Sequence, residues 1–326
     1  MKDLDSPNAA HAVAIVRERL KAAREHRNGA TRCSIQHLDE MNTAAGQFNC
    51  RACDAPVTVR PWGGAECSAC GSVSMHTLPT HSEIAAFYAS YNDNYTGGGK
   101  SGGTNLERYA QRYLDLVHRY AARSGRLIDV GSSNSPFPSL AAASGFNTTV
   151  MDFVRPRGLA SEVKFVAGNI NERNPVGVER NSFDIVTCWA VLEHLPDPRL
   201  SASVLAELCR PGGTLLLSTP EIGTALTRYS LGRSPWFYPP EHLCLVSPAA
   251  VRQLFEPLGC VMQAVSRLEL NPLRYAARYG IGLAEAAIGL PMKVLSPTLW
   301  QRVRDSRLHA FQGISTFVLK KALRPS

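Results

Sequence analysis

The sequence lacks any long hydrophobic run of the kind that crosses a membrane. Its longest weakly charged segment, Tyr279–Leu295, contains Glu285, Pro291 and Lys293, so it is too short and too interrupted for a membrane span. The first residues, MKDLDSPNAAHAV, are polar and lack the apolar core of a signal peptide. We therefore expect a cytoplasmic protein with no membrane span, in which thiols stay reduced.

Charge is also sparse and evenly spread. Charged residues make up 19% of the 326 residues and hydrophobic residues 44%, which is ordinary for a globular protein with a sizeable core. The length suits one large domain plus a small one. The net charge of +8 would suit nucleic acid, anionic lipid or phosphorylated metabolites, but the scattered Lys and Arg do not choose among these partners.

The turn in which a dinucleotide cofactor would need several glycines contains only one. The stretch RLIDVGSSNSPFPSLAAASG, residues 126–145, reads as a buried strand, a turn of small residues and a helix, and the turn keeps only Gly131. A pyrophosphate needs bare backbone amides and the pattern Gly-x-Gly-x-x-Gly, so the sequence disfavours NAD and FAD. S-adenosylmethionine has no phosphates, and serine can still permit the close backbone approach that its aminoacyl end and ribose need.

Strands and helices alternate from Thr104 onward. The segment TNLE predicts a helix start, with Thr104 and Glu107 as a capping box. Apolar runs then predict strands at residues 127–130, 148–151, 163–166, 183–188, 214–219 and 314–322, and one more that ends near Leu270. Alternation of this kind implies an α/β fold with a doubly wound, mostly parallel sheet. Such a sheet binds ligands beyond the carboxyl ends of its strands, near the point where the strand order reverses.

Four of the nine cysteines form two Cys-x2-Cys pairs. Cys50 and Cys53 make the first pair and Cys67 and Cys70 the second, with thirteen residues between the pairs. Two tight turns that each offer two thiolates suit tetrahedral Zn(II), and four cysteine ligands indicate a closed, structural site. Chance pairing is the alternative, and a redox role for one pair would leave the other unexplained. We interpret the remaining five cysteines as small buried hydrophobic residues.

Five motifs in order resemble the class I S-adenosylmethionine-dependent methyltransferases, over roughly residues 104 to 326. LIDVGSSNS is similar to the family's first motif, and Asp152 in TTVMDF falls on the family's ribose-binding acid. FVAGNINE has an asparagine where the family commonly has an aspartate on the adenine amino group, and an amide oxygen can accept that hydrogen bond. AVLEHLPDP and LCRPGGTLLLSTP are close to the pattern of the small-molecule branch.

The resemblance implies a Rossmann-like, seven-stranded sheet and a cofactor site along its edge. The implied cofactor-binding residues in this stretch are Asp129, Gly131, Ser132, Ser133, Asp152, Phe153, Asn169, Ile170 and Trp189. A four-cysteine ribbon followed by FYASYNDNY also resembles the layout of bacterial zinc-ribbon methyltransferases from natural-product and surface-sugar pathways. In those enzymes the tyrosine segment lies against the methionine end of the cofactor, which adds Tyr88, Tyr91 and Tyr95. Aromatic packing of a linker is the alternative for these three tyrosines.

Candidate catalytic residues follow the fourth and fifth strands. Methyl transfer is an in-line displacement, so the enzyme positions two reactants and, where necessary, removes a proton from the acceptor. Glu193 and His194 come directly after the fourth strand, and an imidazole suits proton transfer near neutral pH. His242 follows the fifth strand in a loop beside an aromatic stretch at residues 236–238 that could wall an apolar acceptor, and Glu221 closes STPE. A backbone-bonded histidine in a loop is the alternative for His194.

The sequence predicts a methyltransferase that acts on a small-molecule acceptor such as a sugar, a natural product or a phosphorylated or carrier-linked intermediate. CWAVLEH is not the Asp/Asn-Pro-Pro-Tyr of exocyclic-amine nucleic-acid methyltransferases, which disfavours a nucleic-acid partner. A zinc-ribbon RNA methyltransferase and a non-catalytic binding module with a degenerate fold are the alternatives. The predicted organisation is a helical segment at 1–48, a zinc ribbon at 49–78, a Tyr/Gly-rich linker at 79–104 and a methyltransferase domain at 105–326. A helical insertion at 271–311 is predicted either to wall the acceptor pocket or to cover the sheet edge.

Overall fold

The computed structural model describes residues 49–60, 64–76, 78, 100–170, 177–220, 222, 242–268 and 314–323. Several predicted features lie outside these residues: the helical segment 1–48, Tyr88, Tyr91, Tyr95, Glu221, the aromatic stretch 236–238 and the insertion 271–311. Within the described part of the chain, no helix is both long and apolar enough to cross a membrane.

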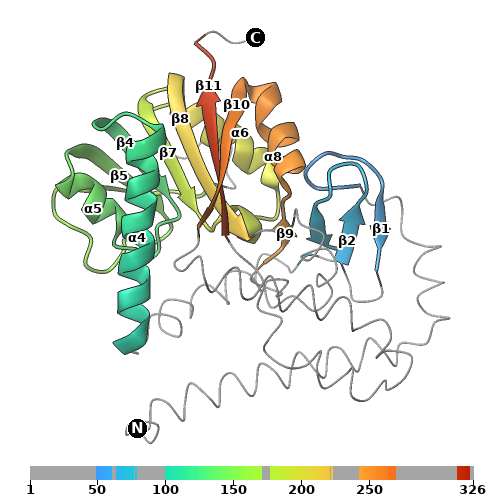
Figure 1. The fold of residues 1–326 in the computed structure, drawn as a ribbon, viewed down its shortest axis with the longest axis horizontal. Coiled ribbons are helices and arrows are strands. Elements are labelled where there is room, and N and C mark those ends of the chain that lie inside the picture. The colour runs from blue at the N-terminus through green and yellow to red at the C-terminus, as the bar shows by residue number, and fades with distance from the viewer. Residues whose placement is uncertain are drawn as a thin grey trace, which may run out of the picture.

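A seven-stranded sheet forms the centre of the main domain that the structure describes (Figure 1). Its order is β10-β11-β8-β7-β4-β5-β6. Strands β4 to β8 are parallel to one another, and β11 runs antiparallel to both β8 and β10. Their bounds are β4 Gly125–Val130, β5 Phe146–Asp152, β6 Lys164–Ala167, β7 Phe183–Trp189, β8 Cys209–Pro220, β10 Cys260–Leu268 and β11 Ile314–Lys321. The predicted α/β fold with a doubly wound, seven-stranded sheet is therefore confirmed.

The strand order reverses beside β4, because β5 lies on one side of it and β7 on the other. In open α/β sheets this switch point opens a crevice at the carboxyl ends of the strands. The final antiparallel pair brings Leu268 opposite Ile314, and Ile314 also lies opposite Pro220 at the end of β8. The chain between β10 and β11 thus leaves and re-enters at the same edge of the sheet as the carboxyl ends of the parallel strands.

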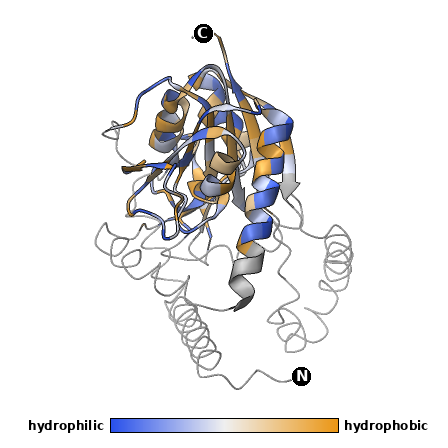
Figure 2. Cartoon of the chain, turned by 90° about the vertical axis from the view of Figure 1, so that its left-hand side faces the viewer, coloured by the Kyte–Doolittle hydropathy of each residue, from blue (hydrophilic) through white to orange (hydrophobic). Residues whose placement is uncertain are grey.

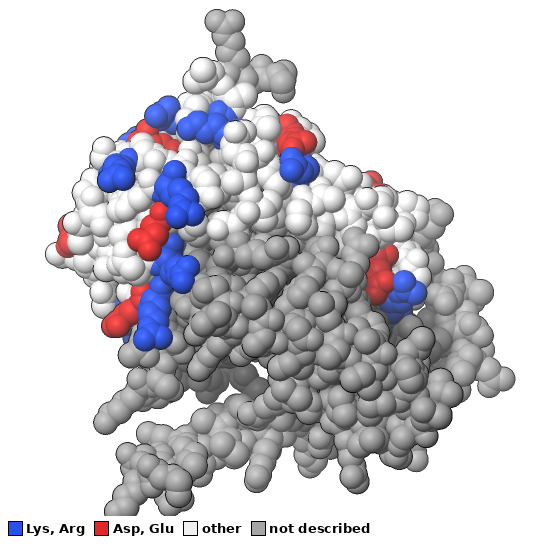
Figure 3. Space-filling view, in the orientation of Figure 1, with Lys and Arg blue, Asp and Glu red and all other residues white. Residues whose placement is uncertain are grey.

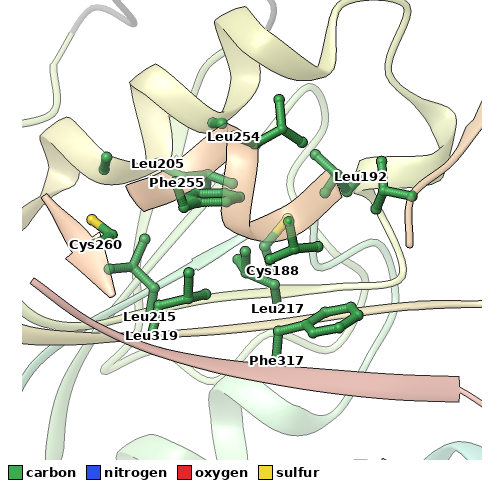
Figure 4. Packing of buried hydrophobic residues seen from close by; sticks show 14 of the residues in the cluster. Cys188, Leu192, Leu205, Leu215, Leu217, Leu254, Phe255, Cys260, Phe317 and Leu319 are labelled. Carbon is green, nitrogen blue, oxygen red and sulfur yellow. The ribbon is translucent and has the colours of Figure 1, made fainter. Parts of the chain in front are cut away.

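Helices cover both faces of the sheet. On one face, α4 (Lys100–Tyr120) and α5 (Phe137–Ala143) share a buried cluster with Leu127, Ile185 and Leu216. On the other face, α6 (Pro198–Leu208) and α8 (Pro248–Phe255) contact Ile128, Val186 and the remaining inward side chains. Figure 2 shows the consequence on α4, whose outer side is hydrophilic while the sheet behind it is largely hydrophobic. Figure 4 shows the second cluster from close by, with Phe255 and Phe317 fully buried among leucines.

The helix starts follow local sequence signals, with one correction. Asp197 caps α6 by accepting hydrogen bonds from the backbone of Arg199 and Leu200, and Ser247 caps α8 by accepting one from Ala250. The capping box predicted that α4 begins at Thr104, which is wrong because the helix begins at Lys100. Two glycines in its first turn disfavour helix by only about 1 kcal/mol each, which does not prevent it from extending.

The cysteine-rich segment, here called the ribbon, consists of β1 (Val57–Val59), β2 (Gly64–Cys67), β3 (Val73–Met75) and the turns that carry the four cysteines. Its strands continue into a fourth, β9 (Cys244–Leu245), which comes from the chain after β8, in the order β1-β2-β3-β9. Its buried cysteines belong to the same hydrophobic cluster as α6 and α8. The ribbon is therefore joined to the main domain through one sheet and one core.

Candidate active site

The turn after β4, residues 131–135, occupies the switch point of the sheet. Gly131 has φ +76°, and a Cβ on it would lie 2.6 Å from a methyl group of Val191, so only glycine fits. Ser133 also has a positive φ, of 48°. We call these residues the cofactor turn. Two left-handed residues within three positions bend the chain sharply between β4 and α5 and bring backbone amides to the sheet edge.

Asp129 lies fully buried beneath the cofactor turn. Its two carboxylate oxygens accept hydrogen bonds from the Ser132 hydroxyl at 2.5 Å and from the Thr187 hydroxyl at 2.6 Å. Burial raises the pKa of Asp129 to about 7, against these hydrogen bonds, which lower it, and with a smaller upward contribution from the charge of Asp152. Asp129 thus joins β4, β7 and the turn.

Asp152, at the end of β5, fixes the turn from the other side. One carboxylate oxygen accepts a hydrogen bond from the backbone N–H of Ser133 at 2.8 Å, and the other accepts one from Phe153 at 2.7 Å. Burial raises its pKa, and the backbone hydrogen bonds oppose this shift. A carboxylate offers about four acceptor sites, so beside its backbone hydrogen bonds from Ser133, Phe153 and Val154, Asp152 can still accept one from a ribose hydroxyl.

The neighbouring strand ends supply the remaining predicted cofactor residues. Asn169 and Ile170 follow β6, where the backbone N–H of Gly168 donates to the Asp152 carbonyl at 3.1 Å. Ile170 is buried and Phe153 is 59% exposed, so a flat ring placed at this edge would find an apolar surface on Phe153. These residues and the cofactor turn share the carboxyl edge of β4, β5 and β6.

Trp189 ends β7 and packs into the helical layer. Its ring stacks on Tyr113 with centroids 4.0 Å apart and an interplanar angle of 7°, and it meets Phe137 edge-on at 5.4 Å. This packing accounts for its 8% exposure. Its Nε1 is buried and finds no acceptor among the residues that the structure describes, which leaves one donor for a ligand at the end of β7.

Glu193, His194 and His242 form a cluster beyond the end of β7, here called the Glu–His–His cluster. The first two lie in a short 3-10 helix, η1 (Leu192–His194), and the third lies two residues before β9. The two imidazole rings meet edge to face with centroids 4.7 Å apart, and His194 Nε2 lies 4.0 Å from the Glu193 carboxylate. Glu193 is 1% exposed, so its carboxylate is shielded from water beside the two imidazoles.

This cluster joins candidates that sequence reasoning kept apart. His194 and His242 were separate candidates for the base, and the structure places them in contact. The connection is a backbone hydrogen bond of 2.7 Å, in which the N–H of Leu243 donates to the carbonyl of Glu193. Because this bond joins positions 50 residues apart (243 − 193) through backbone atoms, side-chain patterns carry no signal of it.

The four cysteines form a second cluster of ligand atoms, inside the ribbon. The Sγ atoms of Cys50 and Cys70 lie 3.6 Å apart and those of Cys53 and Cys67 lie 3.5 Å apart. Four sulfurs at about 2.3 Å from one tetrahedral Zn(II) would be about 3.8 Å apart, so the geometry fits this ion. The neighbouring Cys50 thiol and burial raise the pKa of Cys70 to about 12, and a bound cation would instead favour its thiolate.

The two turns of the ribbon have the same backbone geometry. In each, the carbonyl of the first cysteine accepts a hydrogen bond from the residue four positions later, Asp54 or Gly71. Both of these residues have positive φ, 65° and 73°, and the N–H of Cys70 also donates to the Cys67 sulfur at 3.4 Å. Two equivalent turns that present four sulfurs to one point are what a metal site with four cysteine ligands requires.

Residues 105–265 match a family model described as a methyltransferase domain. Residues 105–265 form a domain of the class I S-adenosylmethionine-dependent methyltransferases. The sequence-based assignment to this family is therefore confirmed, and the strand order described above is that of its fold. The four cysteines are consistent with the small zinc module predicted before the methyltransferase domain.

Curated relatives are similar to this methyltransferase over part of their length. The ubiquinone biosynthesis O-methyltransferase of Aromatoleum aromaticum is 33% identical over 114 residues, which cover 32% of this chain and 49% of the relative. The enzyme of the same name from Xanthomonas campestris is 36% identical over 115 residues, covering 32% and 48%. The chain thus spans about half the length of these relatives, and it covers 80% of the Xanthomonas oryzae enzyme at 28% identity.

Among solved structures, the chain is similar to the 1,6-didemethyltoxoflavin-N1-methyltransferase of Burkholderia thailandensis, which was solved with 1,6-didemethyltoxoflavin and S-adenosylhomocysteine bound. The identity is 16% and the TM-score 0.47, over 77% of this chain and 96% of that one.

Proposed function

We propose that this chain transfers a methyl group from S-adenosylmethionine to a hydroxyl of a small-molecule acceptor. One observation carries the proposal: the cofactor turn and the Glu–His–His cluster lie at adjacent strand ends, with Gly131 of the turn against Val191, two residues before Glu193. A cofactor held on the turn and an acceptor held at the cluster would therefore face one another across the end of β7.

The cofactor residues act by position. Asp152 accepts a hydrogen bond from the ribose, the cofactor turn offers its backbone to the aminoacyl end, and Asn169 and Phe153 border the adenine. Bound S-adenosylmethionine supplies an electrophilic methyl group on a sulfonium. The residues of the chain hold that methyl in line with the acceptor oxygen, and this positioning accounts for most of the rate enhancement in such a displacement.

The Glu–His–His cluster explains how a hydroxyl becomes the nucleophile. One imidazole accepts the hydroxyl proton as the oxygen attacks, and the buried Glu193 carboxylate stabilises the resulting imidazolium. A general base of this kind is needed for a hydroxyl acceptor. The similarity to relatives named O-methyltransferases favours the same acceptor atom.

Surface charge supports a small acceptor over a polyanion. Figure 3 shows basic and acidic side chains interspersed on the described surface, with no continuous basic face in this view. Several arginines are committed to ion pairs, including Arg126 with Glu179 at 2.9 Å and Arg210 with Asp184 at 2.7 Å. Phosphate backbones are bound by clustered cations that are free to neutralise them.

We further propose that Cys50, Cys53, Cys67 and Cys70 hold one structural Zn(II). The support is the pair of equivalent turns and the sulfur spacing given above. With four cysteine ligands the ion has no open position for substrate. Metal analysis of the purified protein should find about one zinc per chain, and Cys67→Ser should lose it. A metal-free protein that is fully folded would reject this assignment.

The cofactor assignment is tested by calorimetry with S-adenosylhomocysteine. Asp152→Ala should bind it at least about tenfold more weakly, because a lost charge-assisted hydrogen bond costs about 1.5–3 kcal/mol. Asp115→Ala is the matched control, since Asp115 is an exposed acid on α4 whose partner is Gln111. Equal affinity for S-adenosylhomocysteine in the Asp152 variant and the wild type would show that Asp152 does not bind the cofactor.

A further inference from the structure

The ribbon is bonded to the chain segment that carries His242. Strand β3 pairs antiparallel with β9, with Val73 opposite Leu245. Beyond this pair, the N–H of Met75 donates to the carbonyl of Leu243 at 2.8 Å, and the N–H of Leu243 donates to the carbonyl of Glu193 at 2.7 Å. Two backbone hydrogen bonds in series therefore run from the ribbon to the Glu–His–His cluster, through the residue next to His242.

A second link starts at a predicted metal ligand. The hydroxyl of Ser247 donates a hydrogen bond to the carbonyl of Cys70 and accepts one from the N–H of Ala250 at 3.1 Å. Ser247 thus connects the second cysteine turn to the first turn of α8. Both Ser247 and Cys70 are 2% exposed, so water does not compete for this contact. The segment from His242 to Ser247 is held at both of its ends.

Apolar side chains pack between the two links, which are the hydrogen bonds at Leu243 and at Ser247. Val73 forms a small buried cluster with Leu245 and Ile222. Cys70 belongs to the same core cluster as Cys244 and Val246, which lie on either side of Leu245 in sequence. His242 itself is 6% exposed. Figure 1 shows β9 lying between the ribbon strands and the main sheet.

The ribbon is too small to hold this geometry through its own core. Its strands have three, four and three residues, and sheets of this size need help from packing, disulfides or a metal. A metal bound to the four cysteines would fix both turns at once. Small modules with such sites unfold when the metal is removed, because the binding energy is part of their folding energy.

We propose that the ribbon is a positioning element of the acceptor site, which holds β9 so that His242 lies against His194 and Glu193. This inference rests on the proposed function and names a second requirement for it. Met75 and Ser247 are positioning residues that act through the backbone of residues 243–247. The cofactor turn is held separately, by Asp129 and Asp152 of the main sheet. Disturbing the ribbon should therefore impair the acceptor side and spare the cofactor side.

The first experiment removes the metal from the full-length protein with a chelator and then restores Zn(II). Amide hydrogen exchange at Leu243 should become about tenfold faster without metal, because its acceptor on Glu193 is no longer held in place. The Kd of S-adenosylhomocysteine should change by less than about threefold. With whichever member of a panel of sugar and phenolic hydroxyl acceptors supports turnover, kcat should fall about tenfold or more. Added Zn(II) should restore both the slow exchange at Leu243 and the wild-type kcat.

Two variants separate positioning from general stability. Ser247→Ala keeps all four cysteines, so its zinc content should equal that of the wild type while exchange at Leu243 rises and kcat falls. Arg60→Ala is the matched ribbon control, because Arg60 pairs with Glu66 on the exposed side of the ribbon and should leave exchange and kcat unchanged. If the chelated protein aggregates, the comparison of these two variants decides the question.

The outcomes are distinct for the two proposals. Unchanged exchange at Leu243 in the metal-free protein and in Ser247→Ala would overturn the positioning role. An unchanged kcat despite faster exchange would overturn it as well. If the wild type fails to bind S-adenosylhomocysteine or to methylate any acceptor, the proposed function fails, and the exchange data alone then decide whether the ribbon holds β9.

Discussion

The two sides of the candidate site are built in different ways. The cofactor side consists of consecutive strand ends of one sheet, and its key hydrogen bonds join residues such as Ser133 and Asp152, 19 positions apart. The other side brings together η1, β9 and the ribbon, and the hydroxyl of Ser247 reaches the Cys70 carbonyl across 177 positions. The first side is held by contacts within the main sheet and the second by contacts between the ribbon and the main domain, so the two should respond to different substitutions.

The largest effect is expected from removing the bases of the Glu–His–His cluster. His194→Gln or His242→Gln should lower kcat by about 10²–10⁴-fold, as usual for loss of a general base. The Kd of S-adenosylhomocysteine should stay the same, because the cofactor side is held elsewhere. His118→Gln is the control, since His118 lies on α4 beside Phe146. If kcat changes by less than about twofold in both variants, neither histidine is the general base and both have a structural role.

The raised pKa of Asp129 should make folding stability depend on pH. Its folded-state pKa, about 7, lies above the ordinary value of 3.8, so the folded protein binds this proton more tightly than the unfolded chain. The contribution of Asp129 to stability therefore falls as pH rises from about 4 through about 7.

Asp129→Asn removes this dependence. The difference in unfolding free energy, wild type minus variant, should decrease by about 2–4 kcal/mol across that pH range. Denaturant unfolding at several pH values measures it. A difference that stays flat or rises with pH would show that the carboxylate is stabilised as an anion beneath the cofactor turn.

Gly131→Ala tests the cofactor side through its backbone. The added Cβ would meet Val191 in a left-handed conformation, which should cost about 1–3 kcal/mol and weaken cofactor binding. Gly145→Ala is the matched control, because Gly145 also has a positive φ but no atom lies within 4 Å of its added Cβ. Val191→Ala should partly restore Gly131→Ala. Equal losses of stability and cofactor affinity in the two glycine variants would mean that backbone strain alone, without contact between residue 131 and Val191, explains the effect.

The smallest effect is expected at the exposed contact between the ribbon and α6. Asp54 and Arg199 form an ion pair of 3.2 Å whose side chains are 62% and 52% exposed. Arg199→Ala should change the unfolding free energy by less than about 1 kcal/mol, as is usual for exposed pairs. Arg252→Ala, which removes an exposed pair that starts within α8, is the control. A larger loss at Arg199 alone would show that this ion pair, as well as backbone pairing, holds the ribbon.

The cofactor side was largely predictable from the sequence because each of its parts has a local signature. Buried strands read as apolar runs, Asp152 ends such a run, and Gly131 marks a turn that needs a positive φ. The four cysteines were predictable for the same reason, since both turns are four-residue units. The start of α4 was not, because the glycines before Thr104 only weakly oppose a helix.

The Glu–His–His cluster could be predicted only as a set of separate residues. Each histidine followed a strand end and was a reasonable candidate by itself. Their contact depends on the pairing of β3 with β9, a strand of two residues without alternating polarity. Such a strand exists because a neighbour is available to pair with it, and that neighbour lies about 170 positions earlier in the chain.

The shared sheet has a consequence for how the ribbon can be separated from the rest of the chain. Without β9, the outer side of β3 would expose unpaired backbone groups next to the apolar side chain of Val73. An open strand edge of this kind readily pairs with another copy of itself. A fragment that stops at residue 78 should therefore self-associate even when it is fully loaded with metal. The remainder of the chain, deprived of β3, would expose Leu245 and the same row of backbone groups. Removing the ribbon cleanly would therefore require a change at β9 as well.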